Sequence, residues 1–229
     1  MKTDKRKIIW KGLLLGGMLC LLPSTAAGQW RVGLTAGGDW NHYVIDKQYM
    51  LDWHFKDRMG LTTGLMGQYD VKDWLGVRAE LNWIQKNYRR YRTGELENTD
   101  YCVRNDYLQL PLMASLSVGG SRLRGFVNLG VYGGYWVSSR NKGTWVNVFS
   151  GITYDFSQKA DFNDERDQRL DCGLLGGIGL EYRFARHWAA QVEGRYYYST
   201  TSVQKDYMHY QDPRYHNTSA LQATICFLF

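Results

Sequence analysis

The sequence has few prolines and cysteines, and it lacks an apolar run long enough to cross a membrane as a helix. Only 3 prolines and 4 cysteines occur among 229 residues. The longest apolar run, residues 12–22, is shorter than the roughly 20 residues that a spanning helix requires. The spacing of histidines and cysteines that is typical of a metal site is also absent. These absences argue against a helical membrane protein and against a metal centre of that kind.

Net positive charge is also small outside the first 28 residues. Residues 1–28 combine a start rich in lysine and arginine, the apolar run, and small residues at 23–28 that suit a signal peptidase. We therefore expect residues 1–28 to be a cleaved signal peptide and residues 29–229 to form one domain. Cleavage removes five positive charges and one negative charge, so the net charge falls from +6 to +2. A nucleic-acid partner is then not expected.

Aromatic residues and glycine are abundant, with 17 Tyr, 9 Trp and 25 Gly. A soluble β-sandwich could share this composition, so the decision rests on which residues share a face of each strand. In residues 107–118, one face carries six apolar residues, and in residues 74–83 and 188–198 the face opposite the apolar one carries charges of both signs. Because a charged face in a bilayer must point to water or a protein interior, this pattern favours a membrane barrel.

The alternation predicts an all-β fold, an eight-stranded antiparallel up-and-down transmembrane β-barrel. Its connections alternate between short and long, and we expect the short turns and both termini in the periplasm and the long loops outside. The last strand ends on the terminal Phe229. The predicted strands are residues 30–40, 60–69, 74–83, 107–118, 124–137, 172–184, 188–198 and 219–229. The predicted long loops are residues 41–59, 87–105, 138–170 and 202–218.

Aromatic residues gather near the ends of these predicted strands. A membrane interface favours the rings of tryptophan and tyrosine, whereas the alternative is that these residues are simply good strand formers. We favour an interfacial girdle, with Trp30, Trp40, Trp74, Trp83, Tyr135, Trp188, Tyr196 and Tyr198 as its members.

The glycine-rich segment 32–38, the segment 107–113 and the terminal Phe229 are similar to a known family. In these segments the chain resembles the PorT-like outer-membrane β-barrel proteins of the Bacteroidetes. The resemblance implies an eight-stranded barrel in the bacterial outer membrane, no catalytic residues and, in the name-giving member, a role in protein secretion. It also implies contact with outer-membrane lipid and with other envelope or secretion proteins. The long acidic segment 155–171 is a departure from that family.

Seven charged residues share the side of the strands that faces the barrel lumen. Ionised groups in a narrow barrel should pair into a network. Such a network could act as a gate or ion path, but an internal structural plug is the favoured interpretation, since an eight-stranded barrel fills its interior with side chains. The predicted lumenal charge network consists of Arg78, Glu80, Arg124, Glu181, Arg183, Glu193 and Arg195.

Three cysteines remain after cleavage, so at least one stays unpaired. Cys102 and Cys172 both fall near the loop ends of their strands, where a disulfide could join two loop bases, although their strands are not sequential neighbours. Cys226 has lumen parity and is expected to be a small interior residue.

The remaining polar clusters give weaker indications of a function. The acidic segment 155–171, or His209 with His216, could bind a cation, but solvated loop residues are favoured because no regular ligand order occurs. An enzyme that acts on lipid A would need a nucleophile, a base and an acid near the outer rim. Ser199, His209 and Asp206 are close in sequence, but nothing fixes their geometry. We therefore expect no enzyme and no cofactor.

Two functions are consistent with these features. The first is a structural or protein-interaction barrel that acts through its extracellular loops or periplasmic turns, with the link to protein secretion that the resemblance implies. The alternative is a narrow channel or gated transport barrel for ions or small solutes, in which the lumenal charges would be functional.

Overall fold

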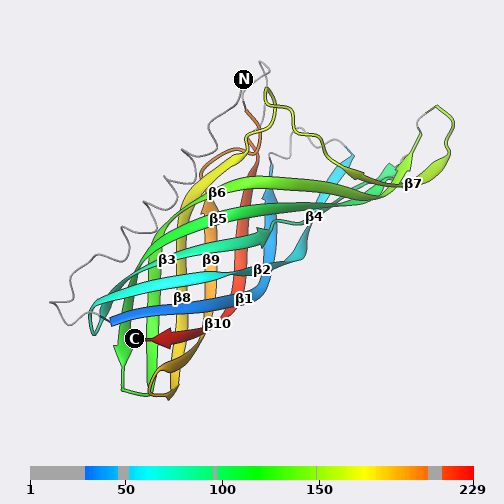
Figure 1. Ribbon diagram of the computed structural model, residues 1–229. Coiled ribbons are helices and arrows are strands. Elements are labelled where there is room, and N and C mark those ends of the chain that lie inside the picture. Colours follow the sequence, from blue (N-terminus) through cyan, green and yellow to red (C-terminus); the bar gives the residue numbers. More distant parts are fainter. Residues whose placement is uncertain (1–28, 46–51, 95–96, 148, 206–212) are drawn as a thin grey trace, which may run out of the picture.

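The computed structural model describes residues 29–45, 52–94, 97–147, 149–205 and 213–229 (Figure 1). The predicted signal peptide, residues 1–28, lies outside the described residues and stays a prediction. Within the described ranges, no helix is long and apolar enough to cross a bilayer. The strands are β1 (Gln29–Val44), β2 (Trp53–Lys72), β3 (Leu75–Gln85), β4 (Tyr88–Arg92), β5 (Asp100–Gly119), β6 (Leu123–Val146), β7 (Thr153–Lys159), β8 (Leu170–Ala185), β9 (Trp188–Ser199) and β10 (Tyr215–Leu228).

Eight of these strands close into a ring. Each pairs antiparallel with its neighbours in the order β1-β2-β3-β5-β6-β8-β9-β10, and β10 pairs back onto β1 from Arg31↔Leu228 to Val44↔Tyr215. Closure satisfies the backbone groups that an open sheet edge would leave unpaired, which is necessary in hydrocarbon. The prediction of an eight-stranded antiparallel barrel is confirmed, and each of its eight predicted strands lies within or overlaps one strand of the ring.

The two ends of the barrel differ in the length of their connections. At one end, which we name the turn end, short connections join β2 to β3, β5 to β6 and β8 to β9. The first residue of β1 and the last residue of β10 also lie at this end (Figure 1). At the other end, the loop end, the connections are long and include β4 and β7. This alternation agrees with the predicted one.

The faces of the strands follow the period of two. On β5, Leu108, Leu110 and Leu112 are exposed on the outside, whereas Tyr107 and Gln109, which alternate with them, are buried inside. The same alternation holds in β9, where Val192 and Tyr196 are exposed and the charged residues between them are buried. An outward apolar face with a polar interior is the pattern of a barrel surrounded by lipid.

Aromatic side chains mark both rims of the apolar outer surface. Trp74 and Trp188 are exposed at the turn end, and Trp40 and Trp83 are exposed towards the loop end. Trp83 lies in register with Leu108, which in turn lies opposite Tyr135. The predicted aromatic girdle therefore consists of two belts, one at each rim.

The wall of the barrel continues past the ring at its loop end. Here β2, β5 and β6 extend beyond the ring and pair with the additional strands β4 and β7 (Figure 1). We name this five-stranded region the wall extension, and it consists of residues 53–57, 88–92, 100–106, 138–146 and 153–159. The predicted loops at 41–59, 87–105 and 138–170 are wrong for these segments. These strand segments were not predicted because none of them has a purely apolar face. Aromatic side chains on them alternate with charged or polar ones.

We expect Gly37→Val to weaken the seam between β1 and β10. A Cβ atom added at Gly37 would lie 2.8 Å from the Cα atom of Gln222, where backbone must shift to make room. Overpacking of this kind costs about 1–3 kcal/mol. At Gly67 no heavy atom lies within 4 Å of an added Cβ atom, so Gly67→Val is the matched control. Urea unfolding of detergent-refolded protein measures both, and equal stabilities would contradict a tightly packed seam.

Candidate functional site

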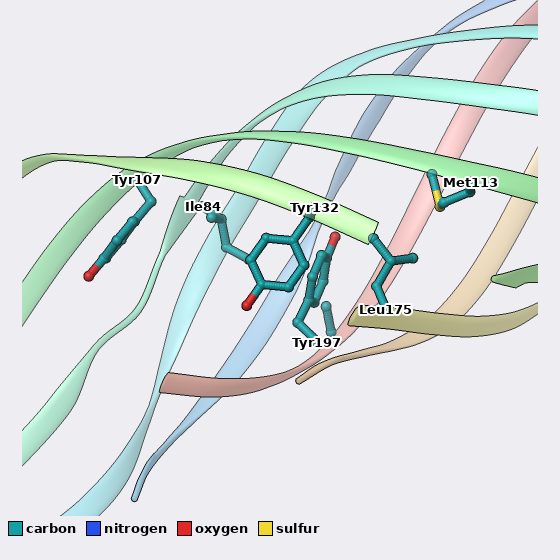
Figure 2. Packing of buried hydrophobic residues seen from close by; sticks show 7 residues of the cluster. Ile84, Tyr107, Met113, Tyr132, Leu175 and Tyr197 are labelled. Atoms are coloured by element: carbon teal, nitrogen blue, oxygen red, sulfur yellow. The ribbon is translucent and has the colours of Figure 1, made fainter. Parts of the chain in front are cut away.

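Side chains fill the interior of the barrel. Figure 2 shows a cluster of apolar and aromatic side chains that point inward, and each is at most 4% exposed; its seven members come from β3, β5, β6, β8, β9 and β10. In this cluster the rings of Tyr132 and Tyr197 meet edge to face, with centroids 5.3 Å apart. The labelled members are Ile84, Tyr107, Met113, Tyr132, Leu175 and Tyr197.

Four charged residues form the centre of a buried network. Arg195 donates to both neighbouring carboxylates, through Nη1 to Glu80 Oε2 at 2.7 Å and through Nε to Glu193 Oε1 at 2.9 Å. Arg78 Nε donates to Glu80 Oε1 at 2.6 Å. The side chains of these four residues are at most 3% exposed. Two positive and two negative charges therefore neutralise each other at a site with almost no solvent exposure.

A second group of four charges lies nearer the turn end. Arg31 bridges two carboxylates, with Nη1 2.5 Å from Glu181 Oε2 and Nε 2.6 Å from Asp70 Oδ2. Arg183 Nε donates to Glu181 Oε1 at 3.0 Å. Gln191 connects the two groups, because it donates to Glu181 at 2.8 Å and accepts from Arg78 at 3.0 Å. The joined network contains four arginines and four carboxylates and is electrically neutral.

The structure brings together six of the seven residues predicted for this network: Arg78, Glu80, Glu181, Arg183, Glu193 and Arg195. The seventh, Arg124, lies apart, since it is partly exposed and donates to the backbone oxygen of Asp73 at the turn end. Sequence reasoning missed Arg31, Asp70 and Gln191. Arg31 has the same parity as the interior residue Thr35, and that signal could have identified it.

A third polar group lies towards the loop end of the interior. Lys86 is fully buried, and its Nζ atom is 2.5 Å from Asp171 Oδ2 and 5.1 Å from the centre of the Tyr107 ring. Ser199 Oγ donates to the other carboxylate oxygen of Asp171 at 2.7 Å. Ser199 is thus a buried partner of Asp171 and not an exposed nucleophile. Asp206 and His209, which sequence reasoning considered beside it, lie outside the described residues.

His216 lies in β10, and its prediction as an exposed loop residue is wrong. It is 2% exposed, and its Nδ1 atom is 2.8 Å from Asn41 Nδ2. The segment around it is polar, and a polar segment can be buried here because the lumen itself is polar. Across the described residues, no group of three or more histidine, cysteine or acidic side chains is arranged to hold a metal ion.

The geometry gives no support to a disulfide between Cys102 and Cys172, because both are free cysteines. They lie on β5 and β8, with β6 between them. Cys102 is opposite Lys142 and Cys172 is opposite Gly133, nine residues away along β6, or about 30 Å. Cys226 is fully buried in the interior, as expected from its parity.

The wall extension carries aromatic rings and arginines on the face that continues the lumenal side. The guanidinium of Arg90 lies over the Trp53 ring at 3.7 Å from its centre, and Trp53 is near Trp145, with centroids 6.2 Å apart. Tyr101 meets Phe156 edge to face at 5.5 Å. Beside these rings is a hollow of about 230 Å³, lined by Tyr101, Asn141, Trp145, Tyr154, Phe156 and Gln158.

The opposite face of the wall extension is charged. Arg89 Nε donates to Asp100 Oδ1 at 2.7 Å, and this hydrogen bond lowers the pKa of the Asp100 carboxyl by stabilising its ionised form. Further along this face lie Arg104, Arg140 and Lys159, which are exposed.

Comparisons with known proteins concern the barrel as a whole. The sequence profile of a family described as outer membrane protein beta-barrel domain matches residues 23–204. Neisserial surface protein A is similar in structure, with 12% identity over 87% of this chain and 96% of that chain and a TM-score of 0.46. Outer membrane protein W of E. coli has 17% identity over 90% and 100% of the two chains and a TM-score of 0.45. Ail of Yersinia pestis has 12% identity over 87% and 98% and a TM-score of 0.43. No curated protein sequence matches the chain significantly.

Proposed function

The chain belongs to the family of outer membrane protein β-barrel domains, and from this premise we propose that it is a closed barrel that presents a protein-binding surface at its loop end. The protein is located in the bacterial outer membrane. We expect the loop end to face the cell exterior, since barrels of this class have short periplasmic turns and long extracellular loops.

The aromatic and arginine face of the wall extension is the observation that carries this proposal. Arg90 stacked on Trp53, together with Tyr101, Trp145 and Tyr154, gives the composition found at the energetic centres of protein interfaces, which are rich in tryptophan, tyrosine and arginine. Tyr154 is 48% exposed, so this face is accessible. Aromatic rings gathered on one face of a sheet are not expected of a solvated loop.

The interior supports a scaffold more than a pore. The neutral network of four arginines and four carboxylates joins side chains from several strands across the lumen, and the aromatic cluster of Figure 2 packs inside the same barrel. The protein-secretion role implied by the PorT-like resemblance is one form that this interaction could take, with other envelope proteins as partners. We expect no catalytic activity, and Ser199, the serine considered as a nucleophile, donates a hydrogen bond to Asp171 inside the barrel.

A narrow channel for ions or small solutes is the second candidate. It is favoured by Gln109, Asn128 and Gln222, which are buried and whose side-chain amide atoms have no hydrogen-bond partner in the described structure. Buried amides of this kind are usually satisfied by internal water. A row of such waters through the lumen would be the start of an ion path, and the single-channel conductance of the folded wild-type barrel decides between the two candidates.

Site-specific photo-crosslinking in living cells tests the proposed binding surface. A benzoylphenylalanine residue replaces Tyr154 on the aromatic face of β7, and the matched control replaces Ser157 on the opposite face of the same strand. Both positions are exposed. We expect a covalent adduct of discrete size from position 154 alone, because only that face has the side chains of an interface. Equal adducts from both positions, or none from either, would refute the surface.

A further inference from the structure

Three cationic side chains lie directly opposite one another on the outward face of the wall extension. Arg104 on β5 is in register with Arg140 on β6, and Arg140 is in register with Lys159 on β7. All three are exposed. Like charges directly opposite each other on neighbouring strands destabilise a sheet. The row is therefore unfavourable unless an anion lies between its members.

The row borders a hollow with the size and chemistry of an anion site. Its volume is about 330 Å³, which exceeds the space that a single phosphate needs and leaves room for part of a sugar. The hollow is lined by Trp83, Arg104, Asp106, Ser138, Ser139, Arg140 and Lys159. Cations, hydroxyls and one aromatic ring thus converge on one space.

One carboxylate, Asp106, also lines the hollow, and it leaves most of the positive charge free. Asp106 accepts hydrogen bonds from Ser138 at 2.8 Å and from Arg104 at 3.3 Å. In the part of the chain that the structure describes, no ion pair is formed by Arg140 or Lys159. Three positive charges against one negative charge leave an excess of about two, which is the charge of a phosphate monoester.

The hollow lies at the edge of the membrane. Trp83 belongs to the loop-end aromatic belt, and it lines the hollow at the same time. Arg104 is four residues beyond Leu108, the register partner of Trp83, or about 13 Å along the strand. With the usual strand tilt this distance corresponds to about 10 Å of height, which reaches the headgroup region of the adjacent leaflet.

We infer that this hollow binds the phosphate of a phosphorylated glycolipid in the outer leaflet of the outer membrane. The two guanidinium groups can each donate two parallel hydrogen bonds to phosphate oxygens, and Lys159 adds a third cation. The Trp83 ring anchors the lipid-facing side of the site. The position beside the acyl chains, on the outward face, selects a lipid headgroup over free phosphate. This site is separate from the aromatic face proposed as the protein-binding surface.

The other rim of the barrel offers a matched control. Lys72, Arg122 and Arg186 are three exposed cations at the turn end. Lys72 lies over the Trp74 ring, and Arg122 and Arg186 lie in the short connections after β5 and β8. Substituting them with glutamine removes the same charge as substituting Arg104, Arg140 and Lys159. General electrostatic attraction to anionic lipid would be reduced equally by both changes.

Native mass spectrometry of the detergent-solubilised protein, titrated with bisphosphorylated lipid A, tests the inference. We expect the variant Arg104→Gln/Arg140→Gln/Lys159→Gln to bind lipid A about tenfold more weakly or worse, since charge-assisted hydrogen bonds are lost. Dephosphorylated lipid A should bind wild-type protein with a similar loss. The variant Lys72→Gln/Arg122→Gln/Arg186→Gln should bind lipid A as wild type does.

Each contrary outcome would overturn the inference. An equal loss in the turn-end control would show general electrostatics, and equal binding of dephosphorylated lipid A would show that the phosphate is not recognised. Displacement of lipid A by inorganic phosphate would identify a site for the free anion instead. If the triple variant does not fold, the single variant Arg140→Gln is judged by the same comparison. None of these outcomes affects the photo-crosslinking test of the aromatic face.

Discussion

Replacing Arg195 with alanine is expected to lower the free energy of unfolding by about 3–5 kcal/mol, the cost of leaving buried charges without a partner. Arg195 has a fully buried side chain and donates hydrogen bonds to Glu80, Glu193 and the hydroxyl of Tyr197. Its removal would leave the central group of the network with two carboxylates, Glu80 and Glu193, and one arginine, Arg78. Urea or guanidinium unfolding in detergent, followed by gel mobility, measures the effect.

Arg122→Ala is the control for this substitution. Arg122 is exposed at the turn end, and a surface substitution away from buried features changes stability by no more than about 0.5 kcal/mol. The double variant Glu80→Ala/Arg195→Ala should cost less than the sum of the two single variants, because the partner is removed together with the charge. Additive losses would contradict a direct ion pair between Glu80 and Arg195.

Replacing Arg78, Glu80, Glu193 and Arg195 together with alanine is expected to make the barrel conduct ions. The change removes two charges of each sign, so it leaves no unpaired charge and keeps the net charge of the chain. It also empties the middle of the lumen, where these four side chains meet. Discrete conductance steps should appear in planar bilayers, whereas we expect none from wild-type protein.

The control for the four-alanine variant uses charges of the wall extension. Two cations and two anions outside the lumen serve for this: Lys56, Arg89, Asp100 and Asp155. Replacing all four with alanine should leave the barrel closed. A correctly folded four-alanine lumen variant without conductance would show that these four side chains do not close the barrel.

The barrel was predictable from the sequence because its strands obey a period of two over long stretches. In β5 and β9 the apolar face is almost uninterrupted, so both the strands and their lumenal side chains, such as Glu193 and Arg195, could be assigned. Parity along a strand also brought Arg78 and Glu181 into one predicted network. Parity identifies the face of a strand but gives no height along the barrel axis. For this reason Arg124 was included in the predicted lumenal network, although it lies at the turn end.

The wall extension was not predictable in the same way. The strand β7, Thr153–Lys159, reads as a polar loop, because its tyrosine and phenylalanine alternate with charged and hydroxyl side chains. It forms a hairpin with the end of β6, from Val146↔Thr153 to Arg140↔Lys159, but neither segment has the apolar face that would have indicated a strand. The cysteines illustrate a related limit: the predicted strand order already placed one strand between Cys102 and Cys172, but only the register shows that their partners on β6 lie nine residues apart.

The central claim is that the barrel is closed to ions and that its function is to bind other proteins at its loop end. Single-channel recording of wild-type protein in a planar bilayer, with a sample whose gel mobility shifts on heating, tests it most directly. We expect a mobility shift, which indicates a folded barrel, together with the absence of discrete conductance steps. Regular steps from the folded wild-type barrel would contradict the claim and favour the narrow channel.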